Sequence, residues 1–244
     1  MQIQPHKQAF GLTTAVRNGE FLDNGPGDGQ PLFHQFRNAG LNAAHMVYQM
    51  PIWMFGASHE KVAYDRFLTQ GYNFKATACN TRGNIEEIGK MIALGSTNAV
   101  IIAGGFQSPR ALAHGNEFGV SIPVIPAEAV WLSTLSKESQ ERALDHMRQT
   151  FGRSRLTEEF LCDFQNVANE ITSGIWKGYT GSHFERYEGY VTDLQAEEKT
   201  STKRQVVKRS ILKSFGDCPL ARRFVLELSG IADILRGEYQ PLTN

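Results

Sequence analysis

The chain has 244 residues, of which 41% are hydrophobic and 20% are charged, and its 25 lysines and arginines are balanced by 25 aspartates and glutamates. This composition is typical of a globular protein that forms one large domain, or one domain with a helical extension. The balanced total excludes a chain that is basic or acidic throughout, although it does not exclude a local basic patch.

The first 45 residues have a weak hydrophobic pattern. They contain the segment DNGPGDGQP at 23–31, whose three glycines and two prolines predict a loop. We therefore expect residues 1–45 to form an irregular N-terminal arm.

Residues 46–134 show the alternation of strands and helices that is typical of α/β proteins. The run TNAVIIAGG is apolar throughout, as expected for a strand that is buried on both faces of a parallel sheet. The alternation predicts a Rossmann-like parallel sheet core with right-handed crossovers. The expected strands lie within 45–58, 73–79, 97–105 and 120–130, and the expected helices within 59–72, 85–96 and 108–119.

Residues 135–244 lose the strand pattern. Amphipathic segments at 136–151, 156–179, 201–215 and 219–237 predict a mostly helical C-terminal portion. The pattern leaves open whether these helices cover the sheet or form a separate lobe.

Three expected strand ends are candidates for a ligand site, because ligands of doubly wound sheets bind outside the carboxyl ends of the strands. They are FGASH at 55–59, CNTRGN at 79–84 and GGFQS at 104–108. The third is the most informative, because two glycines follow directly on an apolar strand.

The residues at the second and third strand ends have the chemistry to bind an anion. Gly104 and Gly105 allow the backbone to approach a ligand closely, and a helix that begins near Ser108 would direct its free amides toward that loop. Arg82 is able to contact a phosphate as a bidentate donor. We expect these four residues to bind a nucleotide or a phosphorylated small molecule. The alternative is a tight turn, a helix cap and an exposed arginine.

Glu117 is the candidate catalytic residue. If the helix that carries it faces the cleft, its carboxylate is able to act as a nucleophile or to bind a ribose. The alternative is a glutamate on the solvent side of a helix.

Residues 81–113, followed by IPVIP at 122–126, resemble the nucleotide-binding part of the phosphofructokinase family. In that family a Ser-Arg or Thr-Arg turn leads into a helix, a hydrophobic strand and a Gly-Gly-Asp-Gly-Ser/Thr loop. The resemblance implies that the phosphate donor is contacted by four residues of this chain: Arg82, Gly104, Gly105 and Ser108.

The sequence departs from the phosphofructokinase pattern at two points. Phe106 stands where the family has a metal-associated aspartate, and AEAVWLS at 127–133 replaces its acidic catalytic segment. We therefore do not expect kinase activity by the mechanism of that family.

The chain is also similar, more loosely, to the Rossmann-like group of cytokinin-activating phosphoribohydrolases and nucleoside deoxyribosyltransferases. In that group a strand leads into a Gly- or Ser-containing loop, and the following helix carries a glutamate. This resemblance implies that Glu117 is catalytic and that a glycosidic group is hydrolysed or transferred. Ligand sensing without catalysis fits the same residues, so the sequence leaves open whether the protein is an enzyme.

A basic segment near the C-terminus supports a second hypothesis, a non-enzymatic interaction or accessory protein. On a helix, Arg204 and Lys208 would lie one turn apart beside an apolar row. Such a stripe is able to bind the phosphates of a nucleic acid, or it is simply a solvated helix face. The cations of this segment are Lys199, Lys203, Arg204, Lys208, Arg209 and Lys213.

Residues 1–10 lack the apolar segment of a signal peptide, and no apolar run approaches the roughly 20 residues that span a bilayer. We therefore expect a soluble, cytoplasmic protein that does not bind membranes. Cys79, Cys162 and Cys218 are far apart and odd in number, which predicts reduced, buried thiols rather than a metal site. The sequence identifies no cofactor, and it leaves open whether copies of the chain form a homo-oligomer.

Overall fold

The computed structural model describes residues 8–12, 16–17, 20–21, 34–48, 52–69, 71–77, 80–94, 99–175, 178–179 and 181–238. In this part of the chain no helix is both long enough and apolar enough to cross a membrane.

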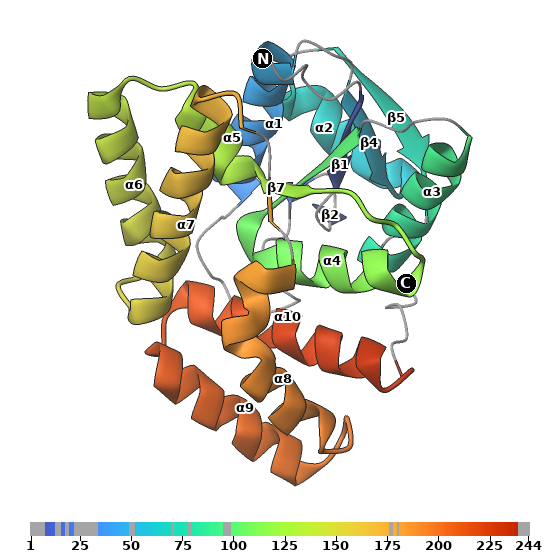
Figure 1. Ribbon diagram of the computed structural model, residues 1–244, viewed down its shortest axis with the longest axis vertical. Helices are drawn as coiled ribbons and strands as arrows, with labels where there is room; N and C mark the ends of the chain where they lie inside the picture. The colour runs from blue at the N-terminus through green and yellow to red at the C-terminus, as the bar shows by residue number, and fades with distance from the viewer. Residues whose placement is uncertain are drawn as a thin grey trace.

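A parallel sheet of five strands forms the centre of the structure (Figure 1). Numbered along the chain, its strands lie in the order 3-2-1-4-5, which is the order of the first five strands of a Rossmann sheet. The predicted Rossmann-like α/β fold is therefore confirmed. From one edge to the other, the strands are β5 (Tyr72–Ala76), β4 (Ile52–Gly56), β1 (Gln8–Leu12), β6 (Ala99–Ala103) and β7 (Val124–Pro126).

The central strand β1 belongs to the segment for which the sequence predicts an irregular arm. Phe10 is fully buried and pairs with Trp53 on one side and Ile101 on the other. A short β2–β3 hairpin (Val16–Arg17 and Glu20–Phe21) and helix α1 (His34–Tyr48) follow. The prediction of an irregular arm over residues 1–45 is thus wrong for these described parts, whereas the predicted loop at 23–31 lies outside the described residues.

The hydrophobic pattern of β1 is weak because the strand contains Gly11, which packs against the side chain of Met54. A Cβ atom at Gly11 would lie 2.3 Å from the sulfur atom of Met54 on the neighbouring strand β4. Glycine lowers the strand propensity of so short a segment. The apolar pattern of β1 is therefore interrupted at the residue that faces the Met54 side chain.

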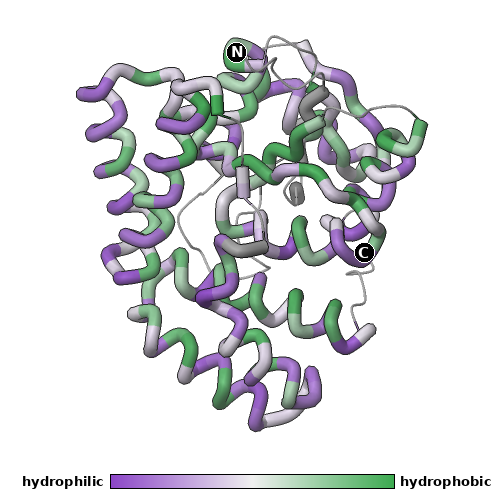
Figure 2. Tube along the Cα trace, in the orientation of Figure 1, coloured by the Kyte–Doolittle hydropathy of each residue, from purple (hydrophilic) through white to green (hydrophobic). Residues whose placement is uncertain are grey.

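Helices cover both faces of the sheet. Met54, Val100 and Ile125 point to the face that α1, α2 (Lys61–Phe67) and α5 (Ala127–Ser133) cover. Phe55 and Ile101 point to the face covered by α3 (Thr81–Ala93) and α4 (Ser108–Glu117). Hydrophobic residues dominate the strands at the centre, whereas the helices alternate between hydrophobic and hydrophilic residues (Figure 2).

Helix α3 begins four residues before the apolar pattern predicts. The side chain of Asn80 accepts a hydrogen bond from the backbone N–H of Gly83 and thereby caps the helix at Thr81. The segment NTRGN, which the sequence places at the end of an expected strand, therefore forms the cap and the first turn of α3, and Arg82 lies on a helix.

The C-terminal portion is helical, as the sequence predicts. Serine side chains cap three of its helices: Ser136 before α6, Ser154 before α7 and Ser201 before α9. The α-helices of this portion are α6 (Lys137–Phe151), α7 (Arg155–Thr172), α8 (Glu188–Gln195), α9 (Thr202–Phe215) and α10 (Pro219–Leu235).

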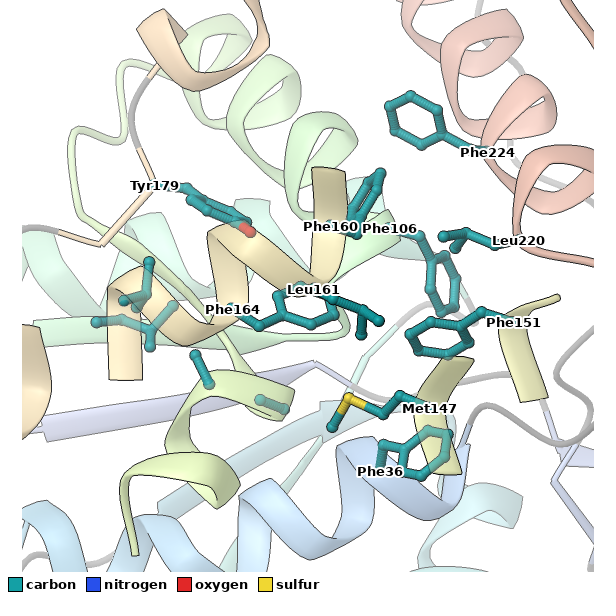
Figure 3. Close-up of a cluster of buried hydrophobic side chains, with 14 of the residues drawn as sticks. Phe36, Phe106, Met147, Phe151, Phe160, Leu161, Phe164, Tyr179, Leu220 and Phe224 are labelled. Carbon is teal, nitrogen blue, oxygen red and sulfur yellow. The ribbon is translucent and has the colours of Figure 1, made fainter. Parts of the chain in front are cut away.

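One hydrophobic cluster joins these helices to the sheet. It contains Phe36 from α1, Phe164 from α7 and Phe224 from α10. Figure 3 shows this cluster, with Phe106 lying among aromatic side chains of the C-terminal helices. The helical portion therefore packs on the sheet and shares its core.

Arg204 does not lie on an exposed basic stripe, contrary to the prediction. It is fully buried between α9 and α10, where Nη2 donates to the carbonyl oxygen of Ser229 at 2.9 Å and pairs with Asp233. Ile211 and Phe215, from the predicted apolar row, are buried in the same interface. Arg204 therefore contributes to the packing of two helices and is not available to a partner.

Candidate functional site

The strand order defines one switch point in the sheet, between β1 and β6. After β1 the chain proceeds toward β4 and β5, and it then returns to the other side of β1 with β6. In doubly wound sheets the carboxyl ends of the two strands at such a point border the ligand crevice. The double glycine follows β6 directly, so it lies at this edge of the sheet.

The turn at 104–108 is buried and held by internal hydrogen bonds. Gly105 to Gln107 form a short 3-10 helix, and α4 begins at Ser108. The backbone N–H of Gly105 donates to Glu128 Oε2 at 2.9 Å, and Ser108 Oγ donates to the carbonyl oxygen of Gly104 at 3.2 Å. The hydroxyl of Ser108 is therefore used inside the turn.

Side chains of the helical portion cover this turn. A Cβ atom at Gly105 would lie 2.2 Å from the ring of Phe164 on α7. Phe106, at the position for which the resemblance to phosphofructokinases implies an aspartate, packs in the core with the guanidinium of Arg223 over its ring at 5.4 Å. Glycine at position 105 is thus explained by the protein's own packing. The predicted contacts of Gly104, Gly105 and Ser108 with a ligand stay predictions.

A cluster of buried polar side chains lies beside the turn. Glu128, in the first turn of α5, is fully buried, and burial raises the pKa of its carboxyl group to about 7. The positive charge of Arg37 on α1 acts in the opposite direction and favours the ionised carboxylate. We call Arg37, Gln107 and Glu128 the carboxyl-edge cluster.

Two oxygen atoms of the carboxyl-edge cluster have no hydrogen-bond partner in the described part of the chain. They are Oε1 of Glu128 and Oε1 of Gln107, both within side chains that are almost completely buried. Burying a polar group without a partner costs about 1–3 kcal/mol. Such groups are candidates for contact with a ligand or with water.

A glycine in α1 brings Arg37 and Glu128 together. A Cβ atom at Gly40 would lie 1.9 Å from the carbonyl oxygen of Ala127, the first residue of α5. Arg37 precedes Gly40 by one helical turn, and Glu128 follows Ala127 directly. The close approach of the two helices therefore brings Arg37 near enough for its positive charge to lower the pKa of the Glu128 carboxyl group.

Arg82 and Glu117 lie together, but not with Ser108. Arg82 Nη2 is 2.8 Å from Glu117 Oε1, and the Nδ1 atom of His114 is 2.9 Å from Glu117 Oε2. Ser108 and Glu117 are the two ends of α4, which places them about 13 Å apart along the helix axis. The structure thus separates Arg82 and Glu117 from Gly104, Gly105 and Ser108, and the catalytic role of Glu117 stays a prediction.

The His114–Glu117–Arg82 chain has perturbed ionisation. Burial lowers the pKa of His114 to about 4 despite the neighbouring carboxylate. Burial opposes ionisation of Glu117, but hydrogen bonds from Arg82 and His114 outweigh it and lower the pKa of its carboxyl group. Since the partners of Glu117 are both protein side chains, this arrangement is an ion pair that fastens α3 to α4.

At the carboxyl end of β4, the buried side chain of Glu60 binds a backbone N–H group of the turn. Oε2 of Glu60 accepts a hydrogen bond from the backbone N–H of Ala57 at 2.7 Å, whereas His59 is exposed. No group of three or more His, Cys, Asp or Glu side chains in the described residues has an arrangement that could hold a metal ion.

Two surface hollows lie away from the carboxyl-edge cluster. One, of about 510 Å³, runs along α7 and is lined by polar residues that include Asp163, Glu170 and His183. The other, of about 500 Å³, lies between α3 and the loop that follows α4. Neither hollow is lined by a residue of the carboxyl-edge cluster, whose three side chains are almost completely buried.

Comparisons with protein-family models, with curated proteins and with solved structures found no match to this chain.

Sequence reasoning missed all three residues of the carboxyl-edge cluster as site residues. Glu128 follows the predicted strand IPVIP by two residues, so the same strand-end rule that selected the double glycine would have selected it. Arg37 gave no comparable signal, because the segment around it lacked a strand or helix assignment.

Proposed function

We propose that the protein binds a nucleotide or a phosphorylated small molecule at the carboxyl edge of the sheet, beside the switch point between β1 and β6. The observation that carries this proposal is the pair of buried oxygen atoms, Glu128 Oε1 and Gln107 Oε1, that lack a hydrogen-bond partner within the described chain. Donor groups of a ligand, such as ribose hydroxyls, would supply the missing partners.

Positive charge at the same edge suits the phosphate of such a ligand. Arg37 lies in the first turn of α1, whose N-terminus follows the glycine-containing connection from β1. Free amides and the partial positive charge of a helix N-terminus favour an anion, and a guanidinium adds a full charge. Both features support a phosphate beside Arg37 and a sugar beside Glu128.

Hydrolysis or transfer of a glycosidic group is the reaction that fits this arrangement. A carboxyl group with a pKa of about 7 exchanges protons readily at neutral pH and is able to protonate a leaving group. We therefore propose Glu128, in preference to Glu117, as the acid of such a reaction. Because Glu128 is fully buried, a ligand that contacts Oε1 must displace side chains that now cover it.

Thermal unfolding in the presence of AMP, ribose 5-phosphate or NAD tests binding. A ligand at 100 times its Kd stabilises the folded state by about 2.7 kcal/mol, which raises the Tm of a chain of this size by several degrees. We expect a shift with at least one of these compounds. The shift should decrease in Glu128→Gln, where an amide oxygen still accepts the Gly105 N–H, and should persist in Glu117→Gln.

The opposite pattern would contradict the placement of the site. A shift that is lost in Glu117→Gln and Arg82→Gln but kept in Glu128→Gln would move the ligand to the α3–α4 pair. Absence of a shift with all three compounds would count against the proposal as a whole. Release of free base from AMP, measured for the wild type and both glutamate variants, separates catalysis from binding alone. Location in the cytoplasm stays a prediction from the sequence, which leaves self-association open.

A further inference from the structure

Helix α9 has an unusual charge composition. Its 14 residues, TKRQVVKRSILKSF, include five cations and no aspartate or glutamate. Arg204 is neutralised by Asp233 inside the α9–α10 interface, and Lys208 is partly buried next to it, where burial lowers the pKa of the Lys208 amine. Three cations, Lys203, Arg209 and Lys213, remain exposed.

The three exposed cations lie on the solvent-exposed surface of α9, which we call its outer face. Arg209 and Lys213 are one helical turn apart on the side opposite to the buried residues Arg204 and Ile211, whereas Lys203 lies at the edge of the exposed surface, about 120° around the helix from Arg209. Lys203 and Lys213 are ten residues apart, which corresponds to about 15 Å along the helix. Figure 1 shows α9 at the end of the molecule that is farthest from the sheet, with α10 between them. The outer face of α9 is therefore accessible in the described structure.

Most other exposed cations of the described chain are paired with a nearby acid. Lys61 pairs with Asp65, Arg142 with Glu138 and Arg155 with Glu159, each at a spacing of four residues. None of the three outer cations of α9 forms an ion pair in the described chain. Their charges are consequently not neutralised by the protein itself.

The character of this face indicates the class of partner. Ile211 and Phe215 point into the core, so the helix has no apolar stripe with which to enter a membrane. Val206 is the exposed large hydrophobic residue of α9. A 15 Å length of nucleic-acid duplex carries about nine phosphate charges. Cations that are spread over about 15 Å of the exposed surface of one helix match such an extended polyanion better than they match a single acidic group.

We propose that the outer face of α9, formed by Lys203, Arg209 and Lys213, binds the phosphate backbone of nucleic acid without base specificity. This inference is independent of the ligand site at the carboxyl edge. The two sites lie on different parts of the fold, so either can fail without affecting the other.

Fluorescence anisotropy with a labelled DNA duplex of 20 base pairs tests the proposal. We expect a Kd of roughly 1–100 µM near physiological salt, as for other non-specific complexes. The logarithm of the association constant should fall with the logarithm of the salt concentration with a slope of about −2.7, for three phosphate contacts. In the triple variant K203A/R209A/K213A, binding should weaken at least tenfold at low salt, and the slope should approach zero.

A matched control removes the same charge elsewhere. Arg66, Lys137 and Arg153 are also exposed and belong to no ion pair in the described chain, so R66A/K137A/R153A makes the same change in net charge. It should bind DNA within about twofold of the wild type. Equal weakening by both triple variants would show that net charge, and not α9, controls binding, and would overturn the proposal.

Two further experiments distinguish binding of nucleic acid from binding of other anions. The assignment to nucleic acid would be overturned if polyglutamate competed with DNA at equal charge concentration. It would also be overturned if the protein bound phosphatidylserine vesicles but not DNA. Absence of any binding at 20 mM salt would overturn it as well. Unchanged far-UV circular dichroism and Tm of both triple variants would establish that a loss of binding does not reflect unfolding.

Discussion

Gly40 illustrates how one residue determines the geometry of the candidate site. It lies in the middle of α1, where glycine is less favourable than alanine by about 1 kcal/mol. In return, it allows α1 to contact the backbone of Ala127 at the start of α5. The glycine therefore serves the packing of α1 on α5 at the expense of the local helix, and this packing brings the charge of Arg37 within electrostatic range of Glu128.

Replacement of Gly40 by alanine should therefore destabilise the protein, although the same change normally stabilises a helix. The new Cβ atom would lie 1.9 Å from a carbonyl oxygen, and backbone atoms cannot move aside as a side chain can. We expect the free energy of unfolding in urea to fall by about 2–3 kcal/mol. Gly189→Ala is the control, because Gly189 is exposed on α8 and its added Cβ meets no atom within 4 Å. That variant should gain about 0.5–1 kcal/mol, and an equal gain in Gly40→Ala would refute the argument.

At the scale of elements, the buried arginine of α9 connects helices that the sequence shows only as separate amphipathic segments. Arg204 donates to the Glu197 carbonyl at 3.2 Å, to Ser229 and to Asp233. Lys199 lies 3.6 Å from the other oxygen of Asp233. The interface between α9 and α10 thus depends on a charged group in a position where a hydrophobic residue would be usual.

Removal of Arg204 alone should be costly. In Arg204→Met, Asp233 stays buried with only Lys199 to balance its charge, and we expect a loss of about 3–5 kcal/mol in the free energy of unfolding. The double variant Arg204→Met/Asp233→Leu removes both charges and should recover a large part of that loss. Lys203→Met, on the exposed side of the same helix, should change stability by less than about 0.5 kcal/mol. Urea unfolding of the wild type, these three variants and the single variant Asp233→Leu measures these differences, and additive effects of Arg204→Met and Asp233→Leu would contradict the coupling.

The elements that the sequence predicts correctly are those in which local pattern and tertiary environment agree. Strand β6 is apolar because both of its faces are covered, and α7 buries one continuous apolar side. Strand β1 was not predicted because its glycine, Gly11, weakens the strand pattern, and the reason for that glycine is a contact with Met54 on another strand. The double glycine could be located from the sequence, but its contact with Phe164 could not, because the two are joined only by the folded chain. The same reason hid the proximity of Arg37 and Glu128.

At the scale of the whole molecule, the helical portion completes the edge of the sheet at which the candidate site lies. Phe164 of α7 covers the turn after β6, and Phe224 of α10 belongs to the same hydrophobic cluster as Phe36 of α1. The sheet and the C-terminal helices therefore share one core, and the stability of the molecule reports on groups in both. Two buried ionisable groups, on α4 and α5, should make that stability depend on pH in opposite directions.

The sign of each effect follows from the direction of its pKa shift. Glu128 has a raised pKa of about 7, against 4.5 for an unperturbed glutamate, so between these values the folded state binds more protons than the unfolded state. Its contribution to stability is therefore present at low pH and is lost as pH rises from about 4.5 to 7. His114 has a lowered pKa of about 4, against 6.5, so the unfolded state binds more protons. Its contribution is lost as pH falls from 6.5 to 4.

The two slopes, each up to about 1.4 kcal/mol per pH unit, should largely cancel in the wild type between pH 5 and 6.5. Glu128→Gln removes one of them, so its stability should rise with pH across this window. His114→Gln removes the other, so its stability should fall with pH. Urea unfolding at pH 5.0, 5.5, 6.0 and 6.5 measures the free energies, and Glu138→Gln, an exposed change on α6, serves as the control with a wild-type profile. If the difference between Glu128→Gln and the wild type stays constant with pH, Glu128 does not titrate in this range, and its role as an acid near neutral pH fails with it.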